Sequence, residues 1–277
     1  MKKLFAAIAA TALTAVCAIS TTACDAGNTI YVNTNAFFAP FEYYDGDEIK
    51  GVDIDIMNMV GEKLGKKVIF ENTEFGPIID NVQSGKRYDC GAAGITITEE
   101  RAEKVAFSTP YYTAKQYVVF AGDTLSVSGT TTGGVEYVLW ESLAGMKIGV
   151  QTDTTGDIYV TDEINATEES DDYDFTGTLY GTGATVTRYD NAQVAIDALG
   201  TIDAVVIDEL PAQYMVSHNE NLHCYALYYD AETATEEQYA ICVTKGNEEL
   251  LNAINDVLKE LGSEGIQKLV AKHLGLD

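Results

Sequence analysis

The sequence predicts an α/β protein of two lobes, in which each lobe is a mostly parallel sheet flanked by helices. Three observations support this fold class: strands and helices alternate from residue 29 onward, the composition changes at residues 122–135, and the chain ends in helices that have no sheet of their own. Because these last helices need an apolar surface to cover, we expect them to return to the first lobe. Two strands must then cross between the lobes, and two crossings form a hinge.

The first lobe is expected to begin as a βαβαβ unit. Its first strand covers residues 29–32, and the spacing of Ile56, Met59 and Val60 predicts a helix at residues 52–64 that ends at Gly65. The second strand, a short helix and the third strand follow at residues 68–70, 78–83 and 88–92.

A second α/β unit follows residues 122–135, which are rich in Gly, Ser and Thr and carry almost no charge. An acidic, irregular run at residues 167–183 interrupts this unit and is expected to be a surface excursion. The strands of the unit are expected at residues 147–150, 185–188 and 204–207, and its helices at 156–164, 192–199 and 210–216.

The end of the chain sets the lobe boundaries. After strands at residues 222–228 and 239–243, two amphipathic helices are expected at 247–261 and 263–274. The boundaries follow: the first lobe comprises residues 29–110 and 240–277, the second lobe 116–234, and the hinges 111–115 and 235–239.

The N-terminus predicts export. Two lysines precede an apolar run at residues 4–19, and small residues continue to Ala23, as in a signal peptide. Ala23 before Cys24 resembles the lipobox of bacterial lipoproteins, in which the cysteine becomes the lipid-modified first residue. We therefore expect a signal peptide at residues 1–23, a linker at 24–28, and attachment through Cys24 to the outer side of the cell membrane, in the periplasm if the cell is Gram-negative. The alternative is a plain cleavable signal that releases the protein.

The charge balance argues against nucleic acid as a partner, because 43 acidic residues face 17 basic ones and give a formal net charge of −26. We expect a monomer without cofactor, and the histidines show no spacing typical of metal ligands. Cys90, Cys224 and Cys242 are expected to be free thiols, although the last two could form a bridge.

The stretch from Ala93 to Arg101 predicts an anion site where a buried strand runs into a helix. Thr98 is placed as the N-cap, and Glu99 and Glu100 occupy the first turn, where the helix dipole favours acids. Unpaired N–H groups at a helix start and the guanidinium fork of Arg101 both suit a carboxylate. The alternative is an ordinary capped surface helix with Arg101 in an ion pair.

Other segments could face the same ligand. Residues 35–43, which carry several aromatic side chains, follow the first strand at the end where open α/β sheets place ligand loops, and Phe75 follows the second strand. Residues 151–156 form a strand-to-helix turn, and Asp208 ends another strand. The alternatives are core packing for the aromatic residues and helix capping for Asp208.

These motifs together resemble the bacterial extracellular solute-binding proteins of the family that serves polar amino acid ABC transporters. The resemblance covers residues 29–276 apart from excursions at 122–143 and 167–183. It implies a type II periplasmic-binding-protein fold that closes on an extracellular L-amino acid and presents it to permease subunits without any reaction. The motifs that carry it are PFEY at 40–43, GVDID at 51–55, AGITITEER at 93–101, FSTPYY at 107–112, QTDTTGD at 151–157 and IDAVVID at 202–208.

The resemblance also implies roles for individual residues. Arg101, Thr96 and the amide of Thr155 are expected to hold the α-carboxylate of the ligand. The α-ammonium group is expected to meet the Gly94 carbonyl, the Thr96 hydroxyl and the Asp208 carboxylate. The ligand side chain should pass between aromatic faces. The complete expected site is Asn35, Phe38, Phe75, Gly94, Thr96, Arg101, Gln151, Thr154, Thr155 and Asp208.

The side chain of the ligand is less defined. Relatives that take cationic amino acids often carry an acid at the position of Asn35, so its neutral amide favours an uncharged polar ligand. Glu42 and the acidity of the chain keep lysine or arginine as an alternative. Asp153 replaces the glycine usual in its turn. A different class, an enzyme similar to the cyclohexadienyl dehydratases, shares the scaffold but needs a general acid and a second anion site.

Overall fold

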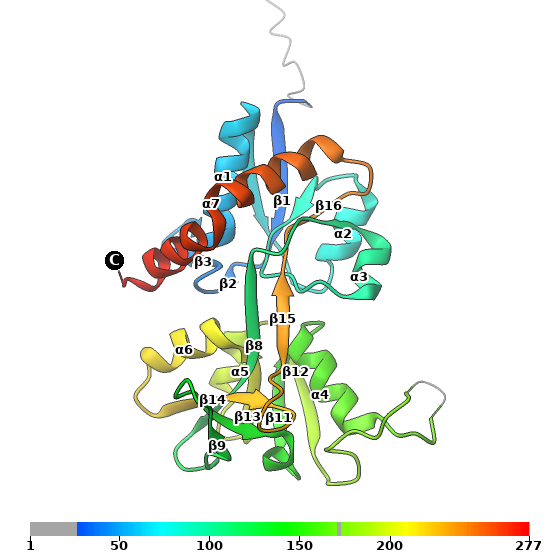
Figure 1. Ribbon diagram of the computed structural model, residues 1–277, viewed down its shortest axis with the longest axis vertical. Coiled ribbons are helices and arrows are strands. Elements are labelled where there is room, and N and C mark those ends of the chain that lie inside the picture. The colour runs from blue at the N-terminus through cyan, green and yellow to red at the C-terminus, as the bar shows by residue number, and fades with distance from the viewer. Residues whose placement is uncertain (1–26, 171–172, 277) are drawn as a thin grey trace, which may run out of the picture.

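The protein consists of two lobes that two adjacent strands connect (Figure 1). This computed structural model describes residues 27–170 and 173–276, so the expected signal peptide and Cys24 lie outside the described residues. Each lobe is a mixed sheet flanked by helices, and the two-lobed α/β fold expected from the sequence is confirmed.

The first lobe contains a five-stranded sheet in the order β5-β1-β6-β16-β7. The first three of these strands pair in parallel, and β16, which comes from the end of the chain, runs antiparallel to both its neighbours. The tail therefore returns to the first lobe. The strands are β1 (Thr29–Thr34), β5 (Lys67–Asn72), β6 (Cys90–Gly91), β7 (Ala106–Phe107) and β16 (Cys242–Val243), and the helices are α1 (Val52–Leu64), α2 (Ile78–Ser84), α3 (Glu99–Lys104) and α7 (Glu248–Leu274).

Helices α1 and α7 pack against each other in the first lobe (Figure 1). Helix α1 buries Ile56 and Val60, and it ends where Gly65 adopts a left-handed conformation with φ 64°. Gly262, with φ 58° and ψ −177°, breaks the helical geometry inside α7 and divides it in two. The two tail helices expected from the sequence therefore meet at this kink.

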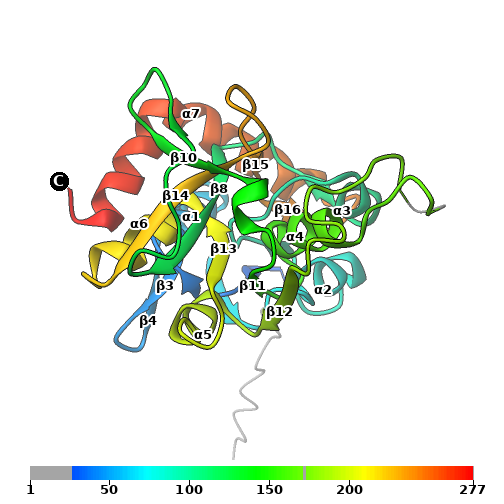
Figure 2. The same ribbon diagram turned by 90° about the horizontal axis from the view of Figure 1, so that it is seen from below.

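The second lobe contains a larger sheet in the order β12-β11-β13-β8-β14-β10-β9 (Figure 2). Its core buries Trp140, Ile148 and Leu227 almost completely. The Gly-, Ser- and Thr-rich stretch supplies β9 and β10 at one edge. The strands are β8 (Tyr112–Ala121), β9 (Gly129–Thr130), β10 (Glu136–Leu139), β11 (Lys147–Gln151), β12 (Thr185–Tyr189), β13 (Ala204–Asp208) and β14 (Leu222–Tyr228), and the helices are η1 (Trp140–Leu143), α4 (Thr155–Asn165), α5 (Ala192–Asp197) and α6 (Glu209–Ser217).

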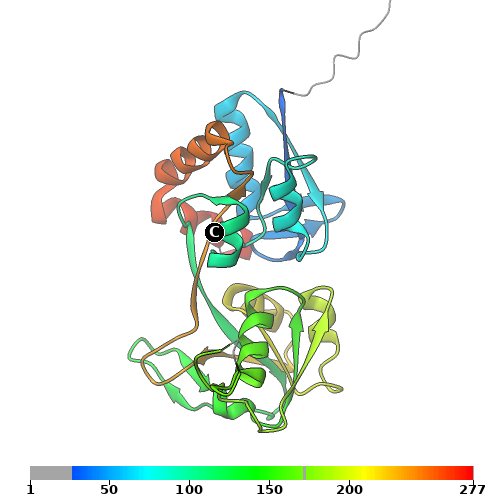
Figure 3. The same cartoon turned by 90° about the vertical axis from the view of Figure 1, so that its right-hand side faces the viewer.

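Two strands pass between the lobes, β8 and β15 (Glu236–Tyr239), as the side view also shows (Figure 3). They pair antiparallel, with Tyr112 opposite Tyr239 and Lys115 opposite Glu236. The two segments expected to be hinges therefore lie side by side. Bending at these segments, and the lobe boundaries themselves, remain predictions.

The PFEY segment folds into a small three-stranded meander, which the sequence analysis did not anticipate. It consists of β2 (Phe37–Phe38), β3 (Glu42–Asp45) and β4 (Glu48–Lys50). The described part of the acidic excursion, residues 167–170 and 173–183, contains neither helix nor strand. Within residues 27–170 and 173–276, no helix has the length and apolar character needed to cross a membrane.

Candidate ligand-binding cleft

A narrow cavity lies between residues of the first lobe and residues of the second lobe. Nine of the ten expected site residues line it, and Glu42 and Ala93 join them. The exception is Arg101, which lines a wider neighbouring cavity that shares Phe75 with the narrow one. The expected residues are therefore gathered at one place, although their roles in binding remain predictions.

Arg101 projects from the first turn of α3. The Thr98 hydroxyl accepts a hydrogen bond from the Arg101 backbone N–H at 3.1 Å, which is the N-cap expected from the sequence. Arg101 is only 8% exposed; its Nη1 donates to the Thr96 carbonyl at 2.9 Å and its Nη2 donates to the Asp153 carbonyl at 3.0 Å. Arg101 is thus a buried cation that connects the two lobes, not the surface ion-pair partner of the alternative interpretation.

The guanidinium group keeps binding capacity for a further anion. It lies 5.4 Å from the centroid of the Phe75 ring. Burial lowers the pKa of Arg101, but an arginine remains charged in proteins. Of its five N–H donors, two are used in the hydrogen bonds to the Thr96 and Asp153 carbonyls, and the others have no hydrogen-bond partner among the described residues.

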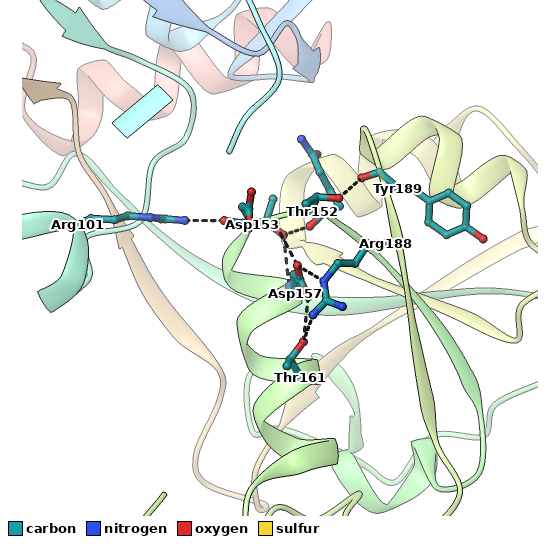
Figure 4. A network of polar contacts seen from close by, with 9 residues as sticks. Arg101, Thr152, Asp153, Asp157, Thr161, Arg188 and Tyr189 are labelled. Atoms are coloured by element: carbon teal, nitrogen blue, oxygen red, sulfur yellow. Dashed lines mark hydrogen bonds and ion pairs between the residues drawn. The ribbon is translucent and has the colours of Figure 1, made fainter. Parts of the chain in front are cut away.

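A hydrogen-bonded network holds the turn that meets Arg101 (Figure 4). The Asp153 backbone N–H donates to Oδ2 of Asp157 at 3.1 Å, and Nε of Arg188 donates to the same oxygen at 2.8 Å. Asp153 has φ 62°, a left-handed conformation that aspartate tolerates better than most residues. The glycine usual here is therefore replaced without loss of the turn, and the Asp153 carbonyl faces Arg101.

Two neutral amides meet across the lobes. Nε2 of Gln151 donates to Oδ1 of Asn35 at 3.0 Å, and Nδ2 of Asn35 donates to the Thr73 carbonyl at 2.7 Å. Asn35 and Gln151 are both buried. This pair forms an uncharged polar part of the cavity wall.

Asp208 stands at the N-cap position of α6, yet its side chain makes no capping hydrogen bond. Its Oδ1 accepts hydrogen bonds from Nε2 of Gln116 at 3.0 Å and from the Tyr239 hydroxyl at 2.6 Å. Burial raises the pKa of Asp208 well above its usual value, and the neighbouring Glu237 raises it further. The carboxyl group therefore lines the cavity and bonds to Gln116 and Tyr239, and it does not cap the helix.

Glu237 is a site neighbour that the sequence analysis did not single out. It lies on β15, is 5% exposed, and accepts hydrogen bonds from the Thr96 hydroxyl and from Nε2 of Gln116, the latter at 2.5 Å. Glu237 and Tyr239 alternate with exposed residues along β15. The sequence carries no such alternation, because residues 236–238 are all polar, so only the structure shows that Glu237 lies on the buried face of the strand.

Glu42 is fully buried, and neither of its carboxyl oxygens has a hydrogen-bond partner among the described residues. Burial raises its pKa well above the usual value, and the charges of Asp53 and Asp208 add to this effect. Asp53 behind it accepts hydrogen bonds from the Tyr111 hydroxyl at 2.5 Å and the Gly94 N–H at 3.0 Å, and burial raises its pKa to about 6. The first-lobe side of the cavity thus carries a buried carboxyl group whose surroundings favour its protonated form.

A family comparison decides what kind of protein has this arrangement. The model of the bacterial extracellular solute-binding proteins, family 3, matches residues 30–276. The chain belongs to this family. It is therefore an extracytoplasmic solute-binding protein and not an enzyme, which removes the dehydratase alternative.

Several relatives of this solute-binding protein are known. It is 27% identical to the arginine-binding extracellular protein ArtP of Bacillus subtilis (strain 168), with 97% of this chain and 95% of ArtP covered. It is 25% identical to the L-cystine-binding protein TcyJ of Escherichia coli (strain K12), with 90% and 84% covered. Among solved structures, an ancestral arginine-binding protein bound to glutamine is 34% identical, with a TM-score of 0.70 and coverage of 90% and 98%.

Proposed function

We propose that this solute-binding protein captures a free L-amino acid between its lobes and delivers it to the permease subunits of an ABC transporter. The observation that carries the proposal is the placement of a buried cation and a buried acid beside one interlobe cavity. Arg101 comes from α3 of the first lobe and Asp208 from the end of β13 in the second. An α-amino acid has a carboxylate and an ammonium group at one end, so both protein groups can bind the same molecule.

The carboxylate end has two sources of hydrogen bonds. The unused N–H groups of Arg101 can form a charge-assisted bidentate contact, which contributes about 1.5–3 kcal/mol. Helix α4 begins at Thr155, and the N–H groups at its start stabilise an anion without any cost of side-chain ordering. Thr154, which caps α4, and Gly94, whose carbonyl belongs to the ammonium side, both line the cavity.

We further propose that the ligand side chain is polar and uncharged. The neutral pair of Asn35 and Gln151 supports this choice, because amides can both donate to and accept from an uncharged polar group. Phe38 supplies an apolar face on the same wall. The glutamine-bound ancestral relative agrees with such a ligand.

A cationic amino acid is the second candidate, favoured by the two oxygens of Glu42 that lack a partner among the described residues. A cation beside Glu42 would stabilise its ionised form and would use both oxygens. The name of ArtP and an arginine-bound structure of the ancestral relative are in line with this candidate.

The remaining parts of the proposal concern motion and attachment. Closure by bending at residues 111–115 and 235–239 would bring Arg101 and Asp208 onto one ligand, as in the hinge closure of periplasmic binding proteins. We also propose that the protein acts as a monomer and is anchored by a lipid on Cys24.

A thermal-shift screen of the common L-amino acids and L-cystine tests the proposal, with prephenate as a ligand of the excluded enzyme class. A ligand at 100 times its dissociation constant should stabilise the protein by about 2.7 kcal/mol. We expect glutamine or asparagine to raise the melting temperature most. A larger shift with arginine or lysine would favour the second candidate, and no shift with any amino acid would contradict the proposed function.

A further inference from the structure

Two buried carboxyl groups lie beside the expected ammonium site, and only one of them has a role in the proposed function. Nε2 of Gln116 donates to Oδ1 of Asp208 at 3.0 Å and to Oε1 of Glu237 at 2.5 Å. Because one nitrogen bonds to both oxygens, these oxygens are at most 5.5 Å apart. The two side chains are 6% and 5% exposed. They form a carboxyl pair shared between the end of β13 and the crossing strand β15.

Glu237 also determines which way the Thr96 hydroxyl points. The Thr96 hydroxyl donates its hydrogen to Oε2 of Glu237. Because a hydroxyl has only one hydrogen, Thr96 Oγ1 can offer only lone pairs to a ligand in the cavity. Lone pairs accept hydrogen bonds from an ammonium group and repel a carboxylate. The hydrogen bond to Glu237 therefore makes Thr96 Oγ1 suited to an ammonium group.

Like charges so close together cannot both be ionised in a buried site without a cation between them. Burial and the neighbouring Glu237 raise the pKa of Asp208. The other ionisable groups that face the pair are Arg101, Glu42, Tyr159, Tyr229 and Tyr239. Burial raises the pKa of Glu42 and of the three tyrosines, so the tyrosines are neutral at pH 7 and the protonated form of Glu42 is favoured. The charge of Arg101 attracts Glu237 and Asp208, but its hydrogen bonds go to two carbonyls instead of the pair.

We propose that Glu237 is a positioning residue of the ammonium site, and that the carboxyl pair of Asp208 and Glu237 releases one proton when the ammonium group of an amino acid enters. The charge balances, since one positive charge enters as the ammonium group and one leaves as the proton. This inference rests on the proposed function. It predicts that affinity rises with pH, by up to about tenfold per pH unit while the free pair still holds its proton.

Isothermal titration calorimetry of the full chain tests the inference with L-glutamine, or with L-arginine if glutamine does not bind. The side chains of free glutamine and arginine do not titrate near neutral pH, so any proton released on binding comes from the protein. Repeating the titration in buffers of different ionisation enthalpy gives the number of protons released. For the wild-type protein we expect the release of up to one proton on binding, and a dissociation constant that falls as the pH rises through the range in which the free pair holds its proton.

The variant E237Q should still bind the amino acid, more weakly, but should release fewer protons than the wild type and show a weaker pH dependence, because burial alone then raises the pKa of Asp208. A merely structural role of Glu237 would change the affinity without changing the proton count. The matched control is E236Q. Glu236 is an exposed neighbour on β15, and its Oε1 lies 3.9 Å from Nζ of Lys115. This variant should release as many protons as the wild type. If E237Q does not fold, D208N replaces it, because loss of either acid removes the pair.

The outcomes separate the two proposals. A wild-type protein that binds an amino acid without releasing a proton, or a folded E237Q that releases as many protons as the wild type, overturns the inference and leaves the proposed function standing. A folded protein that binds no amino acid overturns the proposed function and the inference that rests on it.

Discussion

Replacement of Arg101 by alanine removes the hydrogen bond from the α3 guanidinium group to the Asp153 carbonyl. In the ligand complex it would also remove the charge-assisted hydrogen bonds to the α-carboxylate, which contribute about 1.5–3 kcal/mol. Since 1.36 kcal/mol is a factor of ten, we expect the dissociation constant for the bound amino acid to rise about 10- to 150-fold. Isothermal titration calorimetry measures this change directly.

Two further variants make the Arg101 prediction specific. R101K keeps the charge but loses the planar fork, so its affinity should lie between those of R101A and the wild type. R87A is the matched control, because Arg87 is an exposed first-lobe arginine that pairs with Glu71 and lines neither cavity. The fold of each variant is checked by circular dichroism, since R101A leaves the buried Thr96 carbonyl without its donor. A folded R101A with a dissociation constant within twofold of the wild type would refute the role of Arg101.

Three more predictions follow from the geometry. Burial raises the pKa of Asp53 to about 6 from 3.8, so between these pH values the folded state holds a proton that the unfolded state has lost. The wild type should therefore lose up to about 3 kcal/mol of stability relative to D53N as the pH rises from about 4 to about 6. Urea unfolding at each pH measures this difference, and a difference that does not change with pH would contradict the prediction. A double-mutant cycle tests the amide pair with N35A, Q151A and the double variant. The free energies of ligand binding should show a coupling of about 1 kcal/mol between the two substitutions. If their effects on binding are additive, the amide pair does not stabilise the closed state. G94A should have a lower melting temperature than G46A. Both glycines have a positive φ, but only at Gly94 would the new Cβ lie 2.8 Å from the Phe38 ring. Equal melting temperatures of the two variants would contradict this prediction.

Much of the fold could be predicted because its signals are local. The apolar spacing of α1 and the terminating Gly65 are contained within one helix, and the predicted and observed bounds of this helix agree. The meander at β2–β4 was missed because its strands have two to four residues, too few for an alternating pattern to show. The parallel pairing expected of both sheets holds for β5, β1 and β6 in the first lobe, and for β12, β11 and β13 and for β10 with β14 in the second. In contrast, β8, β9 and β16 pair antiparallel with their neighbours.

The sequence likewise allowed us to predict which residues line the candidate site, but not which partners their side chains bond to. Motifs at the ends of strands identified nine residues that line one cavity, because the fold class brings such ends together. Asp208 illustrates the limit. Its position before a helix suggested a cap, but the direction of its side chain depends on Gln116 and Tyr239, which lie 92 and 31 residues away in the chain.

Residue order and local chemistry were enough to establish two α/β lobes, a capped helix that carries Arg101, and an acid at the end of a second-lobe strand. These features depend on neighbours within a few residues, and so they can be recognised in the chain alone. The partners of the buried charges depended on how the lobes pack. Arg101 meets the Asp153 carbonyl, and Glu237 takes the Thr96 hydrogen, across separations of 52 and 141 residues. Such contacts follow from the pairing of β8 with β15 and from the seating of one lobe on the other, which no local pattern encodes.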